Sequence, residues 1–161
     1  MDELQLFIAL QVLLCALVGL AYGSFGNVLI SRLPAGERVT GRSRCPVCRR
    51  ALHPAELLPL LSFLFLRGRC RTCKSAIAWQ YPLVEAASAV LLLAALPLAS
   101  SLPAAIALGL ALSTLLFIAV VDAQTQTIPD ALSLVLLAWA ALFGWLEGTL
   151  GFGGALLRGG F

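Results

Sequence analysis

The chain has 161 residues, of which 60% are hydrophobic and only 12% are charged. Soluble domains carry about 25% charged residues, so this composition excludes an ordinary soluble domain. The formal net charge is only +3, and nothing in the charge pattern calls for nucleic acid as a partner.

The apolar residues are gathered in four long runs, at residues 4–22, 82–98, 102–121 and 128–146. A helix that crosses the hydrocarbon core of a bilayer needs about 20 residues, with a range of about 17–25. Lipid cannot satisfy open backbone groups, so each run must be helical. The sequence therefore predicts an all-α polytopic membrane protein with four transmembrane helices.

The first run has one alternative, a cleaved signal peptide. Such a peptide has a basic start and a short apolar centre. This chain starts Met1-Asp2-Glu3, and its basic residues follow the apolar run instead of preceding it. We therefore expect the first run to be a membrane helix.

Basic residues are confined almost entirely to one loop. Of the eleven Lys and Arg residues, ten lie between Arg32 and Lys74, and the last is Arg158. The positive-inside rule then places the loop 31–81 in the cytoplasm and the N-terminus outside. The turn at residues 99–101 faces outward, and the short segment 122–127 returns to the cytoplasm.

The same loop carries two Cys-x-x-Cys pairs separated by 21 residues, namely Cys45 and Cys48, then Cys70 and Cys73. Pairs at this spacing are typical of a structural zinc site, since two turns with two thiolates each complete a tetrahedron. Two disulfides and a redox dithiol are the alternatives, and a reducing cytoplasm counts against disulfides. We predict a zinc-ribbon-like loop between the first two helices.

Four basic residues around the second cysteine pair are expected to favour the thiolate form of these cysteines, namely Arg67, Arg69, Arg71 and Lys74.

Cys15 lies inside the first apolar run and is interpreted as a packing residue. His53 is interpreted as an ordinary loop residue beside Pro54, with a metal-binding or catalytic role as the alternative. Residues 57–66 are apolar but too few to span a membrane. They form either a core for the loop or a segment that lies on the membrane surface, and we favour the second interpretation.

Two carboxylates lie at the edges of the third and fourth runs. Asp130 follows Pro129, which is typical of a cap or first-turn position in a helix. Asp122 follows the third run, where a carboxylate opposes the helix dipole, so helix capping does not explain its position. A polar loop that faces water is one explanation. Function is the other, because ionisable residues at membrane edges are functional candidates.

Residues 148–161 are glycine-rich and apolar, with Arg158 as the only charge. They have the composition of a fifth helix that begins but is not completed, so we expect the chain to be a fragment of a longer protein. We divide it into residues 1–99, which hold the first helix, the cysteine loop and the second helix, and residues 100–161, which begin a membrane domain.

Five motifs in this order resemble the type IV prepilin peptidases, a family of membrane aspartic proteases. They are Gly23-Ser-Phe-Gly-Asn27 through Arg32-Leu-Pro34, Arg44-Cys-Pro-Val-Cys48, Leu66-Arg-Gly-Arg-Cys-Arg-Thr-Cys73, Tyr81-Pro-Leu-Val-Glu85, and Asp122 through Ile128-Pro129-Asp130. The resemblance implies a protein of the bacterial inner membrane that cleaves the leader from prepilins and pseudopilins at the cytoplasmic face. Many members also methylate the new N-terminus with S-adenosylmethionine.

By motif match the resemblance makes Asp122 the first catalytic aspartate. The family's second aspartate lies in a Gly-x-Gly-Asp motif that this chain lacks, so we expect the 161 residues alone to be inactive. Asp130 is a weaker candidate for the partner carboxylate. The residues that would bind S-adenosylmethionine are not assigned, although 66–73 is the first place to look. The alternative function is a zinc-bearing membrane scaffold without catalysis.

Overall fold

The structure is a computed structural model that describes residues 2–148, so the rest of the expected fifth helix lies outside the described residues. Four long helices are joined by one long loop and two short connections, and the described part of the chain contains no strand. The long helices are α1 (Glu3–Arg32), α3 (Gln80–Ala95), α4 (Leu102–Thr125) and α5 (Asp130–Leu146); the short ones are η1 (Pro54–Leu57), α2 (Leu61–Phe65) and η2 (Leu96–Leu98).

Three helical segments are long and apolar enough to cross a membrane: Glu3–Arg32, Gln80–Leu98 and Leu102–Thr125. The fourth predicted span is present as an apolar helix, but α5 has only 17 residues. The prediction of a helical membrane protein is thus confirmed at the level of three candidate spans, one fewer than the four that we predicted.

Helix α1 continues well beyond the predicted apolar run and ends at Arg32. Glycines on its inner face pack closely against α3, since a Cβ on Gly19 would lie 2.5 Å from the Cα of Ala89. A Cβ on Gly23 would similarly lie 2.8 Å from the Cα of Glu85. Small residues four apart let two helices approach closely, so α1 lies directly against the backbone of α3.

Helices α4 and α5 complete the bundle through a buried aromatic and polar centre. The fully buried ring of Phe117 lies over Gly26 of α1 and 5.3 Å from the ring centroid of Tyr22. The Tyr22 hydroxyl is 2.7 Å from Thr114 Oγ1 and accepts a hydrogen bond of 3.2 Å from the Trp139 indole. These contacts join α1, α4 and α5 in one core.

Helix α4 also runs past its predicted end at Val121 and stops at Thr125. The extra turn is polar, yet Thr125 donates its hydroxyl to the Val121 carbonyl at 3.0 Å. Gln126 then adopts a left-handed conformation, with φ of 53°, and its N–H donates to the Asp122 carbonyl. This is a common way to end a helix, and apolar patterning alone does not reveal it.

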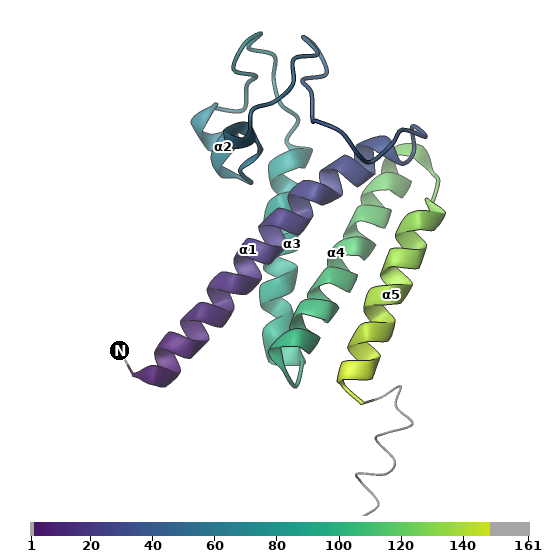
Figure 1. The fold of residues 1–161 in the computed structure, drawn as a ribbon. Coiled ribbons are helices and arrows are strands. Elements are labelled where there is room, and N and C mark those ends of the chain that lie inside the picture. The colour runs from purple at the N-terminus through teal and green to yellow at the C-terminus, as the bar shows by residue number, and fades with distance from the viewer. Residues whose placement is uncertain (1, 149–161) are drawn as a thin grey trace, which may run out of the picture.

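Figure 1 shows the long helices side by side, with the cysteine loop above one end of the bundle and the N-terminus at the other. The connection between α4 and α5 lies at the same end as the cysteine loop. A hydrogen bond of 2.7 Å from Gln124 to Gln80, at the start of α3, supports this placement. The two segments predicted to share one side of the membrane therefore lie at the same end of the bundle.

Candidate functional site

The two Cys-x-x-Cys segments fold into matching turns, which we call the first knuckle (residues 44–51) and the second knuckle (residues 69–76). Each is closed by one isolated bridge, Arg44 to Ala51 and Arg69 to Ala76. Each has a residue in left-handed conformation directly after its second cysteine, Arg49 with φ of 57° and Lys74 with φ of 58°. The knuckles are therefore equivalent positions offset by 25 residues.

The knuckles bring four sulfur atoms together, those of Cys45, Cys48, Cys70 and Cys73. All lie within 4.8 Å of one another, and no other such cluster occurs among residues 2–148. Four thiolates around a zinc ion with bonds of about 2.3 Å would be about 3.8 Å apart. The Sγ atoms of Cys45 and Cys73 are 3.8 Å apart, and none of the described cysteines is in a disulfide. The four cysteines are thus positioned to bind a metal ion.

The electrostatics of the cluster agree with metal binding. Backbone N–H groups of Cys48 and Val47 lower the pKa of Cys45 to about 6, and the Ser75 hydroxyl lowers the pKa of Cys73. The Arg50 backbone also acts to lower the pKa of Cys48, but burial and neighbouring thiols outweigh it and raise that pKa to about 11. Adjacent thiols cannot all ionise unless a cation compensates them. Hydrogen-bond donors, namely backbone N–H groups at Cys45 and the Ser75 hydroxyl at Cys73, contribute most to lowering these two pKa values, and the predicted basic side chains do not.

Residues from the motifs tie the loop to the bundle, a role that we did not predict. The buried carboxylate of Glu85 on α3 accepts a hydrogen bond of 2.8 Å from the backbone N–H of Leu60. Asn27 on α1 donates to the Tyr81 carbonyl at 3.1 Å. These partners are 25 and 54 residues apart in sequence, so periodicity could not have paired them.

Arg32, the last residue of α1, organises the chain that leads to the first knuckle. Its guanidinium donates to the carbonyl groups of Arg38, Val39, Thr40 and Arg42 at 3.1–3.4 Å. One basic side chain thereby satisfies several open carbonyls of a strand-free segment. The only sequence signal for this role was the Arg-Leu-Pro motif itself.

His53 is a loop residue, as interpreted from the sequence, and lies outside the cysteine cluster. It precedes η1, where its Nδ1 accepts from the Ala55 N–H at 3.4 Å. Glu56 completes this cap by accepting from the His53 N–H at 2.8 Å. The same carboxylate pairs with Arg50 at 2.8 Å, and this ion pair lowers the pKa of Glu56 to about 2.

The structure places the two predicted carboxylates at either end of the α4–α5 connection. Asp122 lies exposed in the last turn of α4, and its side chain has no hydrogen-bond or ion-pair partner among residues 2–148. Asp130 is also exposed and is the first residue of α5, after Pro129. The first-turn interpretation of Asp130 agrees with the structure, although its side chain makes no capping bond. Cys15 is fully buried, as expected of a packing residue.

Apolar helices with an attached four-cysteine module define a membrane protein with a candidate metal centre. Residues 17–98 match the family described as "Bacterial Peptidase A24 N-terminal domain", and the chain belongs to this family. No solved structure gives a match.

Several curated relatives carry the name "Prepilin leader peptidase/N-methyltransferase". The relative from Klebsiella pneumoniae is 45% identical over 83% of this chain, and the one from Burkholderia pseudomallei strain 1026b is 37% identical over 87%. The relative from Bacillus subtilis strain 168 is 37% identical over 83% of the chain. The chain spans 61%, 53% and 57% of the lengths of these relatives, respectively.

Proposed function

We propose that this chain is part of a membrane aspartic endopeptidase that removes leader peptides from type IV prepilins and pseudopilins. Family membership is the observation that carries the proposal. The position of Asp122 supports it, because this carboxylate lies at the end of the bundle that bears the cysteine module. A substrate with its apolar segment in the bilayer would present its cleavage site at such an edge.

The proposed chemistry needs two carboxylates that share a proton. The ionised one takes a proton from water, and the protonated one donates to the peptide carbonyl. Asp122 is the proposed first carboxylate, and these 161 residues contain no Gly-x-Gly-Asp motif, which the family resemblance assigns to its partner. Asp130 is the alternative partner, but the structure shows no hydrogen bond between the two side chains, and Asp130 occupies a first-turn position of α5.

The cysteine module supports this function without entering the chemistry. We propose that Cys45, Cys48, Cys70 and Cys73 hold one structural zinc ion, which would fix the two knuckles against each other. Residues 1–99 form the proposed module-bearing part and residues 100–161 the beginning of the catalytic membrane domain. Because Phe117 of α4 lies over Gly26 of α1, these two parts share a core.

The proposed location is the bacterial inner membrane, with the cysteine loop in the cytoplasm and the N-terminus outside. The basic residues between Arg32 and Lys74 support this orientation. A Thr125→Cys variant tests it, since position 125 should resist an impermeant thiol reagent added to intact cells. Labelling from outside would contradict the orientation.

The decisive experiment is prepilin cleavage by the full-length enzyme. Asp122→Asn should lower the cleavage rate by about 10²–10⁴-fold, because loss of a general base has that effect. Asp130→Asn should be mild, because the Asp130 side chain makes no capping bond that Asn would lose, and a negative charge in an exposed first turn contributes only about 0.3–1 kcal/mol. The 161-residue piece should not cleave. Its cleavage of prepilin, lost on changing either aspartate, would show that the two form the dyad themselves.

A methyltransferase activity that uses S-adenosylmethionine is the second part of the proposal, supported by the names of the relatives. Residues 66–73 are the proposed first place to look for its site, since S-adenosylmethionine is polar and cytosolic and this segment belongs to the predicted cytoplasmic loop. Transfer of a labelled methyl group to cleaved pilin tests it. A zinc-bearing scaffold remains the alternative function, favoured by the absence of side-chain partners for both aspartates among the described residues; failure of the full-length wild-type protein to cleave prepilin would support it.

A further inference from the structure

Helix α2 presents a large apolar surface outside the helix bundle. The side chains of Leu61, Leu64 and Phe65 are 50%, 68% and 82% exposed, although they belong to the cysteine loop and not to a candidate span. Leu57 and Leu58, just before α2, are also exposed. A contiguous group of exposed apolar side chains outside the candidate spans indicates a contact with a partner or a membrane.

The position of α2 relative to the membrane follows from its contact with the residue that precedes α3. Phe63 lies with its ring centroid 5.0 Å from that of Trp79, which directly precedes α3 and is 69% exposed. Tryptophan at the end of a membrane helix marks the level of the headgroups. Figure 1 shows α2 beside the beginning of α3, below the knuckles. Helix α2 is therefore held at the level of the membrane surface.

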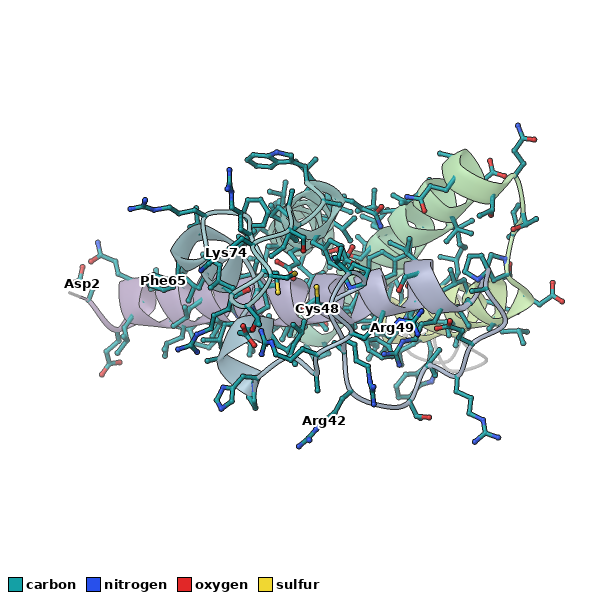
Figure 2. All side chains as sticks on the ribbon, turned by 90° about the horizontal axis from the view of Figure 1, so that it is seen from above. Asp2, Arg42, Cys48, Arg49, Phe65 and Lys74 are labelled. Carbon is teal, nitrogen blue, oxygen red and sulfur yellow. The ribbon has the colours of Figure 1, made fainter. Side chains whose placement is uncertain are left out.

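A group of exposed positive charges adjoins this apolar surface. Arg67, Arg69, Arg71 and Lys74 are all exposed, and none forms an ion pair within the described part of the chain. With Phe65 and Leu66 they line one open pocket. Viewed from the knuckle end, Figure 2 shows Phe65 and Lys74 on one side of the molecule and Arg42 and Arg49 away from them.

We propose that α2 and the second knuckle form a binding site for an anionic phospholipid of the same membrane. The basic side chains would bind the phosphate of the headgroup, while the exposed side chains of α2 would lie among the acyl chains. Charge complementarity supports a lipid, since clustered Lys and Arg beside a membrane helix attract anionic headgroups. The site depends on the membrane placement of the helices and not on peptidase activity.

The chain provides a matched control because the knuckles are equivalent at an offset of 25 residues. Both variants remove three charges. The site variant carries Arg67→Gln, Arg69→Gln and Lys74→Gln, and the control carries Arg42→Gln, Arg44→Gln and Arg49→Gln. Native mass spectrometry of the full chain in detergent measures binding of phosphatidylglycerol and, separately, of zwitterionic phosphatidylcholine.

We expect the wild-type chain to prefer phosphatidylglycerol, and the site variant to lose on the order of tenfold or more in affinity while the control changes about twofold or less. Leu64→Ser with Phe65→Ser leaves the charges intact and should also weaken lipid binding. Equal losses in the site variant and the control would show a net-charge effect and overturn the proposal. So would the absence of a preference for phosphatidylglycerol, or complete displacement of the lipid by inorganic phosphate.

Discussion

The cysteine module and the helix bundle are stabilised in different ways, although they are built from one chain. Between residues 33 and 79 no large apolar residue is buried, and the only residues buried as a whole are Cys45 and Cys70, both members of the candidate metal centre. The bundle instead buries large apolar residues such as Phe117 and Leu92. A segment that buries little apolar surface cannot offset its loss of conformational entropy, so the module needs another source of stability.

The comparison predicts that the module depends on metal and the bundle does not. Cys70→Ser should abolish zinc binding and unfold the loop, because structural zinc contributes about 10–16 kcal/mol in comparable small modules. Helical content should persist. Metal analysis, circular dichroism and limited proteolysis of the purified protein measure these effects. Cys15→Ser is the control and should keep its zinc; retention of full zinc by Cys70→Ser would refute the shared site.

A substitution in the helix bundle should destabilise the bundle and leave the cysteine module unchanged. Gly19→Ala places a methyl group against the backbone of α3, and overpacking of this kind costs about 1–3 kcal/mol. We expect a lower midpoint of thermal unfolding in detergent with unchanged zinc content. Ala21→Val on the exposed side of the same helix is the control. If both variants unfold at the wild-type temperature, the close contact of α1 with α3 is wrong.

The smallest expected effect concerns the ion pair of Arg50 with Glu56 inside the module. Glu56→Gln should lower zinc affinity by less than about tenfold, because a partly exposed pair contributes little. The lowered pKa of Glu56, about 2, keeps its carboxylate ionised in the folded module. The pair's contribution is therefore fully present above the ordinary pKa of Glu and is lost only as pH falls towards 2. The difference in zinc affinity between variant and wild type, measured by competition with a chelator, should stay constant from pH 6 to 8; a difference that changes across this range would contradict the assignment.

Local patterns predicted the elements and the metal cluster well. Two Cys-x-x-Cys pairs were sufficient to propose one shared site, because each turn fixes its own two sulfurs. The helix ends were less predictable. Helix α1 continues past Tyr22 because Gly23 and Gly26 pack against α3 and Phe117, and such contacts depend on the partner helix. The spacing of Gly19 and Gly23 is a known helix-packing signal that would have shown this.

Sequence patterns could not predict the polar contacts between residues far apart in the chain. Glu85 is the one charged residue of the run 82–98, but nothing local indicated that it would accept a hydrogen bond from Leu60. Nor could spacing show that α2 would lie against Trp79. The position of Asp122 in the last turn of α4 came close to expectation, because the end of an apolar run is itself a local feature.

The central claim is that four sulfurs of two knuckles hold one zinc ion at the membrane surface. X-ray absorption at the zinc edge of the purified chain tests it most directly. The claim predicts about one zinc per chain with four sulfur neighbours at about 2.3 Å. A chain without zinc, or one whose zinc has nitrogen or oxygen neighbours in place of any of the four sulfurs, would contradict it.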